Sequence, residues 1–123
     1  MTRLADEQIC WLSTVRPDGR PHLTPIWYVW LDDRFWICTG SAAVKARNIA
    51  ANSAVSVSLQ SGTEPLIAEG IATLHHRPFP DPVVDAFLAT FDWNIALTND
   101  PAEVYDALIE IRVVRWLMGN PAR

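Results

Sequence analysis

The sequence predicts a mainly β fold with accessory helices, and two observations carry that prediction. Short runs rich in β-branched and aromatic residues recur along the chain, separated by turns that contain Gly, Pro or Asp. Segments with helical periodicity are few and short. About six strands, with turns too frequent for the crossovers of a parallel sheet, favour a small antiparallel β-barrel.

Three strands are expected in the first third of the chain, at residues 9–15, 23–31 and 35–38. Asp18 and Gly19 provide the first turn, and Asp32 with Asp33 provides the second. The three strands are therefore expected to form an antiparallel meander. Pro25 interrupts the second run and is expected at an edge, a bend or a bulge, because it has no amide hydrogen to donate.

A helix and two strands are expected in the middle of the chain. The Ala-rich residues 42–51 predict the helix, with Ser41 as its N-cap and an end near Asn52. The strands are expected at residues 55–60 and 66–75, where apolar residues alternate with polar ones. Gly70 is expected to mark a bulge or a point of tight curvature.

The last third is expected to hold two helices and a final strand. Asp81 is suited to cap the first helix, and Pro82 suits its first position. The apolar stripe of this helix is Val83, Val84, Phe87, Leu88 and Phe91. A second, short helix is expected to open at residues 100–101 with Glu103 as its capping partner, and residues 108–117 predict the final strand.

Composition narrows the class of protein. The chain has the length of one domain, spanning residues 1–123. A net charge of -4 argues against a nucleic-acid partner, which would require a basic stripe. Cys10 and Cys38 form no CxxC pair, so buried thiols in a reducing compartment are expected. No signal peptide and no apolar run of membrane-spanning length are evident, so we expect a cytoplasmic protein without a membrane partner.

The tryptophan content predicts an oligomer. Six Trp residues are a heavy aromatic load for a chain of 123 residues. Such side chains are usually buried in a core, against an aromatic ligand or in a subunit interface. One small domain can hardly bury all six. A homodimer with two-fold symmetry is therefore expected.

The string TGSAAVKARN combines a strand end, a Gly-Ser opening and a short basic helix. A helix opened by Gly40 and Ser41 offers free N–H groups and the positive end of its dipole to a phosphate. Lys45 and Asn48 share one face of that helix, and Arg47 can swing toward an anion. The alternative interpretation is a solvated helix with ordinary surface cations.

The segment Thr24, Pro25, Ile26 and Trp27 offers a site for a flat ring. An isoalloxazine ring requires an apolar face and polar main-chain groups at its edge, and an edge strand interrupted by proline offers both. The alternative is that Trp27, like the other tryptophans of this region, only fills the barrel.

Hydrolase and metalloenzyme functions are poorly supported by the sequence. His22, His75 and His76 are the only histidines, and no carboxylate cluster accompanies them. No activated Ser or Cys nucleophile is recognisable, so no metal site is expected and no catalytic acid or base is assigned.

Residues 11–59, WLSTVRPDGRPHLTPIWYVWLDDRFWICTGSAAVKARNIAANSAVSVSL, resemble a known family. The order and spacing of DGxPxxxPIW, the Lys- and Asn-bearing helix and the alternating strand after it resemble the pyridoxamine 5'-phosphate oxidase-like split-barrel family of flavin-binding proteins. The resemblance is strongest to a short branch that includes deazaflavin-dependent reductases, and it covers nearly the whole chain.

The resemblance implies a homodimer of six-stranded antiparallel split β-barrels, with two cofactors bound between the subunits. The cofactor-binding residues it implies are Thr24, Pro25, Ile26 and Trp27 for the ring, Thr39 and Ser41 for the ribityl-phosphate region, and Lys45 and Arg47 for the phosphate, with Asn48 supporting their helix. The second-subunit contacts it implies are Gln60 and Trp116, and Trp93 would wall the substrate space.

Three functions remain open at this point. The first is an FMN-dependent oxidoreductase that transfers hydride to or from a small molecule. The second uses the deazaflavin coenzyme F-420, whose polyglutamate tail would favour a basic groove built from Arg3, Arg16 and Arg20. The third is a flavin- or haem-binding module without turnover. Pyridoxamine-phosphate oxidase activity itself is not expected, because longer family members grip the substrate phosphate with a C-terminal extension.

Overall fold

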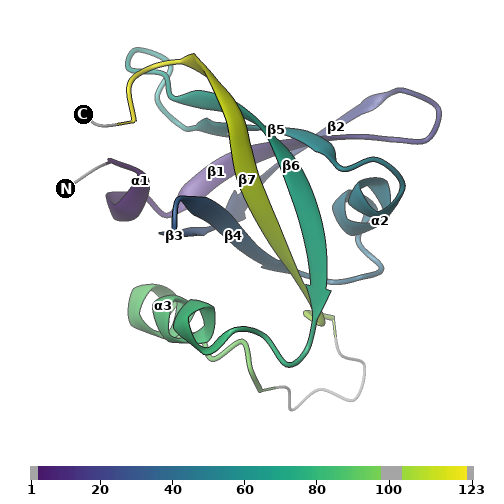
Figure 1. Cartoon of the computed structure of the whole chain (residues 1–123), viewed down its shortest axis with the longest axis vertical. Coiled ribbons are helices and arrows are strands. Elements are labelled where there is room, and N and C mark those ends of the chain that lie inside the picture. The colour runs from purple at the N-terminus through teal and green to yellow at the C-terminus, as the bar shows by residue number, and fades with distance from the viewer. Residues whose placement is uncertain (1–2, 98–103, 122–123) are drawn as a thin grey trace.

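The computed structural model describes residues 3–97 and 104–121. Within these ranges the fold is mainly β, as predicted: seven antiparallel strands form one sheet in the order β2-β1-β5-β6-β7-β4-β3, with three helices around it (Figure 1). The strands are β1 (Ile9–Val15), β2 (Pro21–Trp27), β3 (Val29–Leu31), β4 (Arg34–Thr39), β5 (Ala54–Leu59), β6 (Ile67–His76) and β7 (Ala107–Met118). The helices are α1 (Arg3–Asp6), α2 (Val44–Ala51) and α3 (Asp81–Phe91).

The second predicted strand is in fact two strands, and the expected meander is therefore wrong. β2 pairs with β1, whereas β3 pairs with β4. The run divides at the fully buried Tyr28, whose amide donates to the carbonyl of Gln8 (3.0 Å) and whose hydroxyl donates to the carbonyl of Leu4 (2.9 Å). These two bonds fix Tyr28 against the N-terminal segment and separate β2 from β3. The two strands then form the two edges of the sheet. The barrel is consequently open, or split, between them.

The predicted edge position and turns are confirmed. Pro25 lies in the edge strand β2, opposite Trp11 of β1. Gly19 in the β1–β2 turn has a φ of 89°, and Asp32 and Asp33 in the β3–β4 turn have φ values of 55° and 57°. These left-handed conformations are open to glycine and tolerated by aspartate, which explains the residue types at both turns.

The interior of the barrel is filled by one apolar cluster. On β5, Val55, Val57 and Leu59 are buried while the intervening serines are only partly buried, as the alternation predicted. Cys10 is also a buried, free thiol, and desolvation raises its pKa to about 12. The cluster comprises Leu4, Cys10, Leu12, Tyr28, Phe35, Ile37, Ile49, Val55, Val57, Leu59, Leu66, Ala72, Ile109 and Ile111.

A second apolar cluster lies outside the barrel, between α3 and the strands that this helix covers. Val83 and Phe87 of α3 are buried with Val29 of β3 and Trp36 of β4. Leu88 was predicted to lie on the same buried face, and this prediction is wrong, because Leu88 is 45% exposed. The face of α3 that packs on the sheet is narrower than the predicted apolar stripe. No helix that the structure describes is long and apolar enough to cross a membrane.

The start of α3 differs in detail from the prediction. Pro82 lies in the first turn as expected, but Asp81 is already helical, and the N-cap position is Pro80, which makes no side-chain capping bond. The extended backbone of Pro80 therefore leads the chain into the helix without an Asp cap. The short helix expected at residues 100–101 lies outside the described residues.

Gly70 lies at an irregularity of the sheet, as predicted. The β6–β7 register shifts between Glu69 and Gly70. A β-carbon on Gly70 would lie 2.7 Å from the carbonyl oxygen of Arg112 and 2.8 Å from Cγ2 of Ile111. The two long strands therefore approach one another at a point where no side chain fits.

Gly70→Ala is expected to lower the free energy of unfolding by about 1–3 kcal/mol, because the added methyl group pushes β6 and β7 apart. Gly62→Ala is the matched control, since no atom lies within 4 Å of the position its β-carbon would take. That variant should change stability by less than about 0.5 kcal/mol. Chemical denaturation measures both, and equal stability of the two variants would contradict the close approach.

Candidate functional site

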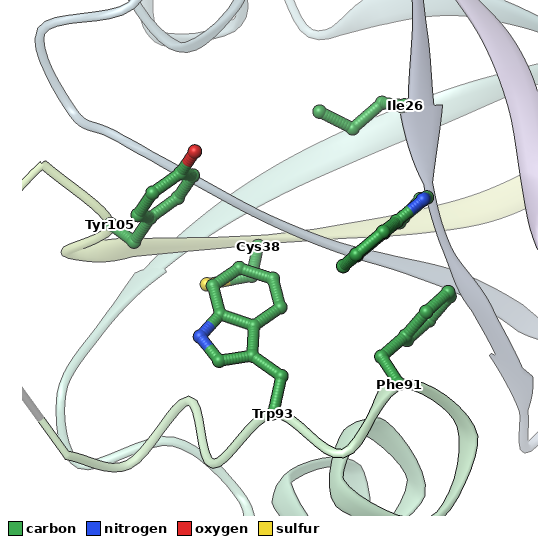
Figure 2. A pocket seen from close by; sticks show the side chains of 6 residues that line it. Ile26, Cys38, Phe91, Trp93 and Tyr105 are labelled. Atoms are coloured by element: carbon green, nitrogen blue, oxygen red, sulfur yellow. The ribbon is translucent and has the colours of Figure 1, made fainter.

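The candidate site lies where the barrel is split. No strand ladder joins β2 to β4, and side chains from both strands border a cavity of about 500 Å³. Figure 2 shows Trp93 and Tyr105 across this cavity from Ile26, with Cys38 behind them. We call it the apolar cavity, and it is lined by Ile26, Trp27, Cys38, Phe91, Trp93 and Tyr105.

Aromatic rings form most of the wall of the apolar cavity. Trp27 stacks on Phe91, with ring centroids 4.5 Å apart and an interplanar angle of 8°. Trp93 meets Trp27 edge-on at 6.2 Å and Tyr105 edge-on at 5.1 Å. Since these rings fix one another and no lining residue carries a charge at neutral pH, the cavity suits a flat, apolar group. Trp93, predicted to wall a substrate space, lies in this wall.

A second depression of about 680 Å³ continues from the first, and the two share Ile26 and Tyr105. We call it the polar hollow, because it lies at the end of β4 and over the turn that leads into α2. Its further lining residues are Thr39, Gly40, Ser41, Ala42, Ala43, Lys45, Val104 and Asp106. The structure thus brings Thr39, Ser41 and Lys45 together with Ile26, as the predicted site requires.

Lys45 supplies the positive charge of the polar hollow, and it is the only lysine in the sequence. Its pKa is lowered because burial penalises the charged ammonium group. An anion bound beside Lys45 would relieve that penalty. Arg47 is exposed and does not line the polar hollow, so the structure separates these two predicted phosphate ligands.

Ser41 does not cap α2, and that prediction is wrong. The helix begins at Val44, its N-cap position is Ala43, and no side-chain capping bond is made. The Asp106 carboxylate accepts a hydrogen bond from the Ser41 amide at 2.6 Å and one from the Ser41 hydroxyl at 2.7 Å. The amide and the hydroxyl of Ser41, which were expected to contact a phosphate, thus both donate to the Asp106 carboxylate. The helix end near Asn52 is confirmed.

Asp106 is the site residue that the sequence did not reveal. Thr39 of β4 pairs with Ala107 of β7, and this register brings Asp106 beside Ser41 across 65 residues of sequence. The hydrogen bonds from Ser41 hold the pKa of Asp106 below its usual range. A fixed negative charge therefore lies in the same hollow as Lys45.

Asn48 holds α2 on the barrel. Its side chain is 3% exposed, and Nδ2 donates to Oγ1 of the fully buried Thr14 of β1 at 3.0 Å. The predicted supporting position of Asn48 is consistent with this bond, and Thr14 is a partner that sequence reasoning missed.

Four further predicted residues lie apart from the two depressions in this chain. Thr24 is on the inner side of β2, and its Oγ1 is buried without a hydrogen-bond partner among the described residues. Pro25 is exposed on the outer side. Gln60 is exposed after β5, and Trp116 lines a separate cavity with Trp30. Across the described ranges, no group of three or more His, Cys, Asp or Glu side chains is arranged to hold a metal ion.

Comparisons with known proteins find similarity over most of the chain. A family model described as pyridoxamine 5'-phosphate oxidase matches residues 1–118. A solved structure of an F-420 reductase is 28% identical, with 92% of this chain and 91% of that chain covered and a TM-score of 0.68. A search of curated proteins found no match.

Two further solved structures show the same fold at lower identity. A putative pyridoxamine 5'-phosphate oxidase from Listeria innocua is 17% identical, with 92% and 89% of the two chains covered and a TM-score of 0.69. A heme storage protein from Vibrio cholerae is 20% identical, with 88% and 82% covered and a TM-score of 0.71. At these identities the likeness is one of fold alone.

Asp106→Asn is expected to lower the free energy of unfolding by about 1 kcal/mol at neutral pH, because a charge-assisted pair of bonds to Ser41 is weakened. A carboxyl whose folded pKa is depressed contributes stability above its unfolded pKa of about 3.9, and loses that contribution as the pH falls through the folded pKa. The difference between wild type and variant should therefore shrink below about pH 4.

Denaturation curves at several pH values measure this difference. Asp85→Asn, on the exposed side of α3, is the matched control and should change stability little at any pH. A difference between wild type and Asp106→Asn that stays constant from neutral to acidic pH would contradict a role for the ionised carboxylate.

Proposed function

Since the chain belongs to the pyridoxamine 5'-phosphate oxidase family, we propose that it is an oxidoreductase that binds FMN in the apolar cavity and the polar hollow. The cofactor would lie at a homodimer interface and exchange hydride with a small molecule.

The observation that supports this proposal is the continuity of the two depressions through Ile26 and Tyr105. One end is walled by aromatic rings without charge, and the other end carries Lys45, hydroxyl groups and a helix beginning. FMN has the same division, with a flat, largely apolar ring joined to a polyol and a phosphate. A further donor beyond the two depressions suits this group: Thr24 lies on the same side of β2 as Ile26, and its buried Oγ1 has no protein partner among the described residues.

The protein residues would act by binding and by excluding water. Ile26 and Trp27 provide an apolar surface for one side of the ring, while Phe91 and Trp93 close the cavity beside it. Lys45 would hold the phosphate and so fix the position of the ring relative to the substrate space. When bound, FMN supplies the two-electron redox chemistry.

The homodimer is supported by an apolar patch on the outer face of β1 and β2. The register places Trp11 opposite Pro25, and Leu23 and Trp27 are two residues to either side of Pro25, so all four share one face. Trp11, Leu23 and Trp27 are 37%, 59% and 48% exposed. A second copy that covered this patch would also cover the apolar cavity, because Trp27 belongs to both. Gln60 and Trp116 remain proposed contacts from the partner.

A deazaflavin cofactor is the second candidate, and the 28% identical F-420 reductase structure favours it. Arg16, in the turn after β1, is one of the cations that the sequence offered for the tail of that cofactor, and its charge acts on His22 together with that of Lys45. The absorption spectrum and mass of the molecule that co-purifies would distinguish FMN from F-420. A haem-binding function is supported only by a structure at 20% identity, which carries fold and no function.

Lys45→Ala is expected to weaken FMN binding by about 1.5–3 kcal/mol, or about 10- to 150-fold, because a charge-assisted bond to the phosphate is lost. Fluorescence titration of the purified protein measures the dissociation constant. Riboflavin, which lacks the phosphate, is the control ligand and should bind both proteins equally. Unchanged FMN affinity would remove Lys45 from the site, and a wild-type protein that binds neither FMN nor F-420 would overturn the proposed function.

Leu23→Glu is expected to convert the homodimer to monomers and to weaken FMN binding about tenfold or more, because a charge is buried in the proposed interface. Leu88→Glu is the matched control, since Leu88 is exposed to a similar degree but lies on α3. Light scattering gives the oligomeric state. A wild-type monomer, or a Leu23→Glu dimer, would contradict the assignment of this patch.

A further inference from the structure

Three residues of β2 form a row on the inner side of the sheet. Ile26, Thr24 and His22 lie opposite Cys10, Leu12 and Thr14, respectively, and these three partners are fully buried. Paired residues of neighbouring strands point to the same side, so the row faces the interior rather than solvent. Ile26 lines both depressions, and the row therefore leads from them toward the β1–β2 turn.

The Asn48–Thr14 bond fixes α2 beside this row. Thr14 is the register partner of His22, and Asn48 donates to its hydroxyl. Lys45 precedes Asn48 by three residues, so the two side chains leave α2 on the same face. Lys45 and His22 are close enough to interact electrostatically.

Two polar atoms of this row are buried without a hydrogen-bond partner among the described residues: Nδ1 of His22 and Oγ1 of Thr24. Nε of Arg34 is also buried and makes no hydrogen bond of good geometry, but it lies 2.6 Å from Oε2 of Glu110 and is therefore part of an ion pair. Buried polar groups in native proteins are nearly always satisfied, so an unpaired imidazole and hydroxyl in one row point to a missing ligand.

The surroundings define the chemistry of that ligand. The charged side chains that act on His22 are Arg16, from the β1–β2 turn, and Lys45, from α2, and both are cations. The imidazole and the Thr24 hydroxyl can each donate a hydrogen bond. Two donors between two cations fit an oxyanion with several acceptor atoms, such as a phosphate monoester.

We propose that His22 and Thr24 complete the anion-binding end of the polar hollow, and that His22 takes up a proton when the cofactor phosphate binds there. This inference rests on the proposed function for the identity of the anion, and it adds a proton-coupled ligand that the family resemblance did not assign. Lys45 then acts as one of several donors rather than alone.

The direction of the proton coupling follows from the charges. Without ligand, desolvation and the charges of Arg16 and Lys45 lower the pKa of His22, which favours the neutral ring. A bound phosphate raises that pKa, because an adjacent anion favours the imidazolium. Between the two pKa values binding takes up a proton, so affinity falls as the pH rises through this window.

The first test compares FMN affinity of the wild type and His22→Gln from about pH 5.5 to 8.5, on either side of the ordinary histidine pKa of about 6.5. The ratio of the two dissociation constants cancels the titration of the phosphate itself. Wild type should bind about tenfold tighter than the variant at the acidic end, with the advantage disappearing at the alkaline end. Riboflavin should show no such trend. A ratio that does not change with pH would overturn the proposal.

His75→Gln is the matched control, because His75 pairs with Glu110 on the other side of β4 and β7, away from the row. It should leave the pH dependence of FMN affinity as in the wild type. Loss of the pH dependence in His75→Gln but not in His22→Gln would assign the proton to the wrong residue and overturn the proposal.

The second test needs no variant. The imidazole signals of the wild-type protein are titrated by NMR with and without inorganic phosphate, and the pKa of His22 should rise with phosphate. A rise without FMN binding would support the anion site and contradict the proposed function alone. FMN binding with His22 unmoved by FMN and by phosphate would overturn this inference and leave the proposed function standing.

Discussion

The structure depends on the break that Tyr28 imposes on a long apolar run. Its amide and hydroxyl bond to the N-terminal segment, and its ring is fully buried there. The residues before the break therefore pair with β1, and those after it pair with β4. The same run thus supplies both edges of the sheet, β2 and β3, and no ladder joins these edges to close the barrel. The candidate site occupies the opening that this constraint creates.

The opening has opposite properties at its two ends. Toward α3, aromatic rings from β2, the end of α3 and the segment before β7 stack on one another and exclude charge. Toward α2, Lys45 and Asp106 place opposite charges in one hollow. A ligand with a flat apolar end and an anionic end fits this gradient in one orientation only. Since Asp106 offsets Lys45, anion binding at that end depends on further donors, which β2 can supply.

Local patterns predicted most of the elements and brought several candidate site residues to the two depressions. The alternation on β5, the proline of the edge strand and the irregularity at Gly70 were all recognisable, because each reflects a short-range constraint on the backbone. Ile26 and Lys45, which the sequence assigned to one site, both line the polar hollow. The cap assigned to Ser41 failed because a carboxylate far along the chain competes for the same donors.

Local patterns are enough to predict a β-rich chain in which an apolar strand is followed by a short lysine-bearing helix, because strand alternation and helix composition are local properties. The division of the second strand and the contact of Asp106 with Ser41 arise only when the strands pair. The same holds for His22, which comes to lie opposite Thr14, the residue that Asn48 of α2 contacts. These outcomes depend on the register of β1 with β2 and of β4 with β7. Register arises from packing and pairing summed over whole strands, so no single stretch of sequence reveals it.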